Sequence, residues 1–217
     1  MGILPFIIVC PLTFLAGFVD AVAGGGGLIS LPAFMIAGLP VHTAIATNKL
    51  SSSMGTSVAT GRLAKHGHIH WKQTIPCFFT AIIGSSCGAN LALMVDAELF
   101  KRLMLIIIPV TAFYVMRANF DEKRLDLTEK QMIIRSVLIA LGIGVYDGFY
   151  GPGTGTFLLL LLTTLAGYRL QEANGTTKAI NLTTNLAALT VYLLNGKVLL
   201  PLGLCGHSLN SVDGINP

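Results

Sequence analysis

Two aspartates and two lysines interrupt stretches of sequence that are otherwise apolar or rich in small residues: Asp20, Lys49, Asp147 and Lys178. Each lysine follows an aspartate at a similar distance, 29 positions in the first case and 31 in the second. A charge at the centre of a bilayer costs about 2.5–3.5 kcal/mol, so such charges are tolerated when they are paired or hydrated. We therefore expect each aspartate to have its own lysine. The pairs then either lock the fold or border a pathway for a charged solute, in which an aspartate could carry a proton.

Runs of glycine follow both aspartates. Residues 24–27 are four consecutive glycines, and residues 148–155 contain four more around a proline. A glycine inside a helix costs about 1 kcal/mol relative to alanine, so both runs predict a break between a long helix and a short one. The apolar pieces that follow, residues 28–39 and 156–166, are too short to span a bilayer at about 1.5 Å per residue. Their free N–H groups and positive dipole ends would favour an anion, and the two lysines could add positive charge.

The two halves of the chain resemble each other around these features. Residues 17–26 match residues 144–153 at a constant offset of 127, and residues 47–49 match residues 176–178. Paired segments interrupted by glycine or proline point to the binding site of a transporter. We expect inverted copies if each broken segment is re-entrant and parallel copies if it crosses once, and we favour the inverted arrangement. The predicted parts are a first transmembrane repeat (1–118), a charged cytoplasmic connection (119–131), an incomplete second transmembrane repeat (132–200) and a polar C-terminal tail (201–217).

The composition is that of a membrane protein. Charged residues make up 11% of the chain, against roughly 25% in an ordinary soluble domain, and the mean hydropathy is +0.73. We predict an all-α integral membrane protein, a polytopic helical bundle with two repeats, each starting with a Gly-broken helix. The net charge of +4 is modest. Lys and Arg gather in the connections at 62–72 and 117–135, where the positive-inside rule accounts for them. We therefore expect both connections to be cytoplasmic and no nucleic-acid partner.

Catalysis and metal binding are the weaker interpretations. Two intramembrane aspartates could share a proton, as in an intramembrane aspartyl protease, but the chain has no Gly-x-Gly-Asp motif. His66, His68 and His70 alternate in a basic connection beside Trp71, a pattern more typical of an interfacial loop than of a metal site. We predict no catalytic residue, no metal and no cofactor.

Four segments resemble one known family: residues 17–29, 46–50, 146–155 and 177–181. They are similar to the TauE/SafE family of sulfite and organosulfonate exporters, in its YfcA-like branch. The resemblance implies a multi-pass protein of the bacterial inner membrane. It would export small sulfur-containing anions by alternating access around a site at two broken helices, with the lipid bilayer and an anionic substrate as partners. It also implies these substrate-binding residues: Asp20, Gly24, Gly25, Gly26, Gly27, Asn48, Lys49, Asp147, Gly151, Gly153, Thr154, Lys178 and Asn181.

The C-terminal part departs from the family pattern. Family members usually continue through two further apolar spans, whereas this sequence turns polar at Gly206, which looks like a C-terminal shortening. An inactive or non-transporting membrane fragment is therefore the alternative. The sequence leaves open which anion is carried, which ion drives it, in which direction it moves, and whether the protein forms a homodimer.

Overall fold

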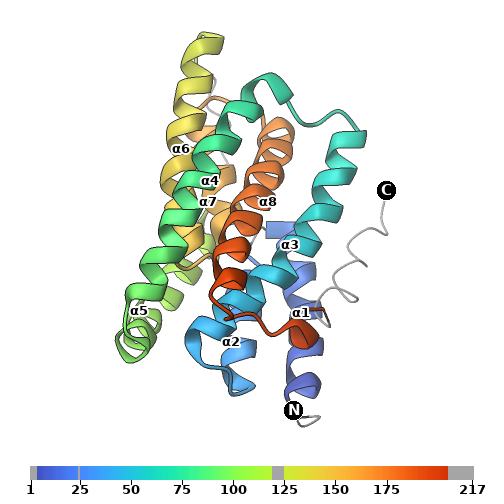
Figure 1. The fold of residues 1–217 in the computed structure, drawn as a ribbon. Helices are drawn as coiled ribbons and strands as arrows, with labels where there is room; N and C mark the ends of the chain where they lie inside the picture. Colours follow the sequence, from blue (N-terminus) through green and yellow to red (C-terminus); the bar gives the residue numbers. More distant parts are fainter. Residues whose placement is uncertain (1–3, 24, 119–124, 205–217) are drawn as a thin grey trace.

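The computed structural model describes residues 4–23, 25–118 and 125–204, and within them every regular element is a helix (Figure 1). The helices are α1 (Leu4–Ala23), α2 (Gly27–Ile36), α3 (Val41–Lys65), α4 (Trp71–Met94), α5 (Ala97–Arg117), α6 (Glu129–Phe149), α7 (Thr154–Thr164) and α8 (Leu170–Leu194). In this part of the chain, α4, α5 and α6 are long and apolar enough to cross a membrane. The chain is an all-α membrane protein, as its composition predicts.

A long helix gives way to a short one at both glycine runs. The first break lies between α1 and α2, and the second lies between α6 and α7. The short helices have 10 and 11 residues. At the second break, Gly151 and Gly153 take φ angles of +99° and +83°, a left-handed conformation that glycine adopts without steric cost. Each break thus follows from local sequence, whereas the correspondence of the two halves as repeats stays a prediction.

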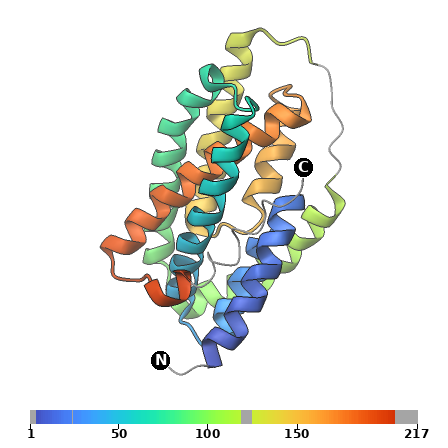
Figure 2. The same ribbon diagram turned by 90° about the vertical axis from the view of Figure 1, so that its right-hand side faces the viewer.

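The two broken hairpins enter the bundle from opposite ends (Figure 1, Figure 2). In Figure 1, α1 begins at the bottom and α2 returns there, whereas α6 begins at the top and α7 returns to the top. α3 and α8 pack against each other and run in opposite directions. The starts of α4 and α6 lie at the same end, where Lys72 and Glu129 form an ion pair of 2.8 Å. This is the arrangement that inverted copies would take.

Close approach of α4 and α6 depends on small residues. A Cβ at Gly84 would collide with the Leu141 carbonyl oxygen, and one at Gly148 would collide with the Ser85 carbonyl oxygen. Small residues of this kind let the backbones of membrane helices approach closely, where packing and polar contacts hold them together. The α4–α6 contact is therefore a rigid seam along one side of the bundle.

Apolar side chains fill one end of the bundle and cover its outside. A buried cluster, here called the lower apolar cluster, joins the α1–α2 hairpin to α3, α5 and α8: Leu31, Phe34, Ile45, Phe100, Tyr150 and Tyr192. Large apolar side chains are also exposed, above all on α5, where Leu105, Ile106 and Met116 point outward. In a membrane protein such a surface faces lipid, whose tails are as apolar as these side chains.

The helices also reach beyond the predicted boundaries of the connection and the tail. α6 begins at Glu129, inside the predicted connection 119–131, because Thr128 and Gln131 form a reciprocal capping box at its first turn. Residues 201–204 of the predicted polar tail are helical. Residues 119–124 and 205–217 lie outside the described residues.

Candidate functional site

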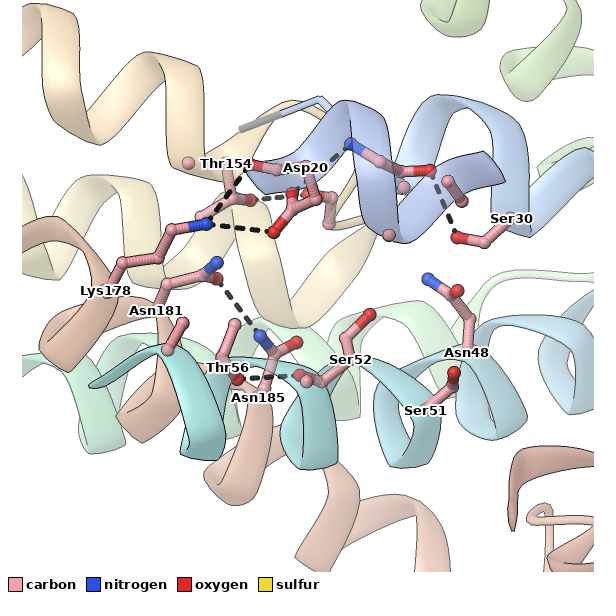
Figure 3. Close-up of a pocket in the computed structure, with 18 of the residues that line it drawn as sticks. Asp20, Ser30, Asn48, Ser51, Ser52, Thr56, Thr154, Lys178, Asn181 and Asn185 are labelled. Atoms are coloured by element: carbon pink, nitrogen blue, oxygen red, sulfur yellow. Dashed lines mark hydrogen bonds and ion pairs between the residues drawn. The ribbon is translucent and has the colours of Figure 1, made fainter. Parts of the chain in front are cut away.

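A cavity of about 300 Å³ lies where the two breaks meet α3 and α8 (Figure 3). α8 contributes residues at intervals of three or four: Asn174, Lys178, Asn181 and Asn185. α3 contributes a matching row: Asn48, Ser52, Gly55, Ala59 and Arg62. Such intervals place each row on one helix face. Asn48 is buried and Arg62 is exposed, so the cavity opens toward the end of the bundle where α3 finishes and α8 starts.

The first ion pair of the cavity is sealed. Lys49 Nζ lies 2.8 Å from Asp147 Oδ2, and each side chain is 2% exposed. Lys49 also donates to Asn185 Oδ1 at 3.2 Å. Thr154 Oγ1, at the start of α7, donates to Asp147 Oδ1 at 2.7 Å. Breaking a buried pair of this kind would leave an uncompensated charge, so both partners are held in place.

The second ion pair is partly open to the cavity. Lys178 Nζ lies 3.0 Å from Asp20 Oδ2, and the two side chains are 9% and 28% exposed. Lys178 also donates to the Asp20 backbone carbonyl at 3.3 Å. The other carboxylate oxygen, Asp20 Oδ1, accepts from the Gly26 N–H at 3.2 Å, at the start of α2. Figure 3 shows Lys178 reaching across the cavity wall to Asp20.

Each lysine pairs with the aspartate of the other half of the chain. The expectation that each aspartate has its own lysine is confirmed, and the partner is not the lysine that follows the aspartate in the same half. The reason is the way the breaks face each other: a Cβ at Gly27 would lie 2.9 Å from Pro152 Cα. With the breaks in contact, the lysine of α3 reaches the end of α6, and the lysine of α8 reaches the end of α1.

Both short helices already carry a carboxylate at their N-terminal ends. Asp20 accepts from the Gly26 N–H before α2, and Asp147 accepts from the Thr154 hydroxyl at α7. A negative charge at a helix N-terminus is stabilised by the dipole. The sequence alone predicts that these ends favour a substrate anion. In the structure the protein's own aspartates fill them.

Most of the predicted residues line the cavity: Asp20, Gly26, Gly27, Asn48, Lys49, Asp147, Gly151, Gly153, Thr154, Lys178 and Asn181. Gly151 leaves room for the sealed pair, since a Cβ there would lie 2.8 Å from Lys49 Nζ. Gly25 is buried without lining the cavity, and a Cβ there would lie 3.3 Å from Val115 Cγ1. Gly24 lies outside the described residues.

Several polar residues of the cavity were not predicted: Ser30, Ser51, Ser52, Thr56, Arg62, Asn174 and Asn185. Apart from Ser30, which lies on α2, their signal is polar spacing at three and four residues along α3 and α8, a pattern that also fits contacts between helices. Asn185 donates to Asn181 Oδ1 at 3.1 Å. Asn48 is 6% exposed, and its Oδ1 has no hydrogen-bond partner among the described residues.

Polar side chains of several kinds line the cavity. In the part of the chain that the structure describes, no group of three or more His, Cys, Asp or Glu side chains is placed to hold a metal. The cavity instead offers ammonium, amide and hydroxyl groups from Lys178, Asn181, Asn48 and Ser52. These are donors that oxyanions accept from.

Comparison with known proteins finds similarity over most of the chain. The family model for the sulfite exporter TauE/SafE matches residues 9–210. "Probable membrane transporter protein ORF9" of Sinorhizobium sp is 36% identical over 192 residues, which are 88% of this chain and 73% of the relative. "Probable membrane transporter protein YfcA" of Escherichia coli K12 is 33% identical over 201 residues, which are 92% and 72% of the two chains. No solved structure matches. With the family model covering nearly all of its length, the chain belongs to the TauE/SafE family.

Proposed function

We propose that this membrane transporter of the TauE/SafE family exports small sulfur-containing anions, such as sulfite or sulfonates, from the bacterial cytoplasm across the inner membrane. The proposal is carried by one observation: the polar cavity between α3 and α8 contains a lysine, Lys178, whose ion pair with Asp20 is partly open to the cavity. A cavity of about 300 Å³ is about ten times the roughly 30 Å³ that one water occupies in the liquid. That size fits a small solute with a partial water shell.

The shape of the cavity supports alternating access. It opens toward the end of the bundle that holds Arg62 and Asn174, and the lower apolar cluster fills the opposite end. The connection at residues 62–72 is basic, and basic connections lie on the cytoplasmic side. The described state is thus one in which an anion enters from the cytoplasm. Movement of the two opposed hairpins would then open the other end in a multi-pass bundle.

Transport is favoured over proteolysis by the partners of the aspartates. A protease of the aspartyl type needs two carboxylates that share a proton. Here Asp147 is bound by Lys49 at 2.8 Å and Asp20 is bound by Lys178 at 3.0 Å. Each carboxylate is neutralised by a cation, so neither is available as half of a proton-sharing dyad.

The test is sulfite efflux from proteoliposomes that contain the purified protein. We expect efflux above that of protein-free vesicles, and a large decrease in Lys178→Ala because the cation of the partly open ion pair is lost. Lys197→Ala is the matched control, since Lys197 is exposed and does not line the cavity. Efflux equal to that of empty vesicles, or unchanged in Lys178→Ala, would contradict the proposal.

A further inference from the structure

We infer that the Asp20 carboxylate occupies the anion subsite of the cavity, and that the transported anion binds by replacing it. The inference rests on the proposed function and goes one step further, because it assigns the groups that contact the anion. The subsite consists of the Gly26 N–H and the Lys178 ammonium group, and Asn48 lines the same cavity.

The contacts of Asp20 are those of a bound oxyanion. One oxygen accepts from a backbone N–H at the start of α2, at 3.2 Å, and the other lies 3.0 Å from Lys178 Nζ. A helix N-terminus and a lysine are the groups that hold phosphates, sulfates and carboxylates in other proteins. α2 has 10 residues, so its dipole is developed. A substrate oxyanion would find both donors in place.

Asn48 supplies an independent indication of a ligand. Its side chain is more than nine-tenths buried, and Oδ1 has no partner among the described residues. Figure 3 shows the amide of Asn48 projecting from α3 toward the start of α2, where Ser30 lies. Buried amides in native proteins nearly always have partners. The unpartnered atom is an acceptor, so its partner must donate, as a water of the anion's hydration shell or the hydroxyl of a protonated oxyanion does.

The surroundings of Asp20 allow its carboxylate to leave, whereas those of Asp147 do not. The Asp20 side chain is 28% exposed in the cavity, so it can be hydrated when it is displaced. The Asp147 side chain is 2% exposed and is bound by both Lys49 and Thr154. A monovalent anion that replaces the carboxylate leaves the charge next to Lys178 unchanged. The uncompensated charge is then that of the displaced Asp20 carboxylate, which water in the cavity can hydrate.

The inference makes a prediction that a purely structural role for Asp20 does not make. If the carboxylate competes with the substrate, removing its charge strengthens anion binding. If Asp20 only positions Lys178, removing its charge weakens binding. Asp20→Asn separates the two cases, since asparagine keeps the size of the side chain and an oxygen that can accept from Gly26.

The experiment is equilibrium dialysis of radiolabelled sulfite against the purified protein in detergent. We expect the dissociation constant to fall about tenfold in Asp20→Asn, which corresponds to 1.4 kcal/mol, and to rise in Lys178→Gln. Glu129→Gln removes an exposed carboxylate far from the cavity and serves as the matched control. If Asp20→Asn does not fold, Asp20→Ser is measured instead, with the same expectation.

The outcomes distinguish this inference from the proposed function. Unchanged or weaker binding in Asp20→Asn, with wild-type binding intact, overturns the inference and leaves anion transport standing. Absence of sulfite binding and efflux in the wild type overturns both. A second measurement uses the wild-type protein alone. Sulfite added to it should shift the infrared band of an aspartate carboxylate. The absence of any shift would contradict displacement of Asp20.

Discussion

The two breaks hold their aspartates in different ways. At the second break, Asp147 is enclosed by Lys49 and Thr154 and is almost without exposure. The Tyr146 hydroxyl donates to the Pro152 carbonyl at 2.6 Å and ties the loop to α6. At the first break, the Asp20 side chain is partly exposed in the cavity and is bound by one lysine and one backbone N–H.

The backbone is also more constrained at the second break than at the first. Gly151 and Gly153 are held in the left-handed region, whereas Gly26 has an ordinary helical φ of −55°. Conformations that few residues can adopt persist when the surrounding contacts determine them fully. The second break thus behaves as an anchor and the first as the adjustable end of the cavity. Similar motifs in the two halves therefore serve different roles.

The largest expected difference between the two breaks is in the loss of stability when each lysine is removed. Lys49→Ala should lower the free energy of unfolding by about 3–5 kcal/mol, because it leaves Asp147 buried without a counter-charge. Lys178→Ala should cost clearly less, since Asp20 retains some access to water. Reversible unfolding in mixed detergent micelles measures both. The double variant Lys49→Ala/Asp147→Ala should recover part of the loss, and equal losses in the two single variants would refute an anchor at the second break.

A loss of stability of intermediate size is expected when Gly151, in the backbone of the second break, is replaced. Gly151→Ala should cost more than about 1–2 kcal/mol, the price of a left-handed alanine, because its Cβ would also meet Lys49 Nζ at 2.8 Å. Gly38→Ala is the matched control, since Gly38 has a φ of +89° and a Cβ there would meet nothing within 4 Å. Thermal unfolding compares the two. A Gly151→Ala cost no larger than that of Gly38→Ala would show that the contact with Lys49 is not tight.

The smallest effect compares one hydroxyl at each break. Thr154→Val removes a hydrogen bond to a carboxylate, and such bonds contribute about 1.5–3 kcal/mol. Ser30→Ala removes a bond of 3.3 Å to the neutral Gly26 carbonyl, which should cost about 0.5–1.5 kcal/mol. Unfolding in detergent again gives the free energies. A larger loss in Ser30→Ala than in Thr154→Val would reverse the order of rigidity that we assign to the two breaks.

The local features of the site can be predicted from the sequence, but the contacts between its parts cannot. The breaks are predictable because consecutive glycines disfavour a helix wherever they occur. Asp20 and Lys178 are conspicuous because charge is rare in apolar stretches. Which lysine binds which aspartate depends on how α3 and α8 cross the breaks, and no spacing along the chain encodes that crossing.

The polar row on α3 shows a second limit of sequence reasoning. Serine and threonine are small enough to pack between membrane helices and polar enough to line a cavity, so their presence fits both roles. Ser53 donates to a backbone carbonyl of its own helix and does not line the cavity, whereas Ser51 and Ser52 line it. Only the rotation of α3 against its neighbours distinguishes these roles, and that rotation is a property of the assembled bundle.

The crossed ion pairs also constrain how this protein can change over evolutionary time. Because Lys49 needs Asp147 and Lys178 needs Asp20, a charge lost by mutation in one half leaves its counter-charge stranded in the other. Neither half can drift alone at these positions, and a lineage that loses one member of a pair should lose or replace its distant partner as well. Substitutions at the paired positions of the two halves are thereby coupled through charge.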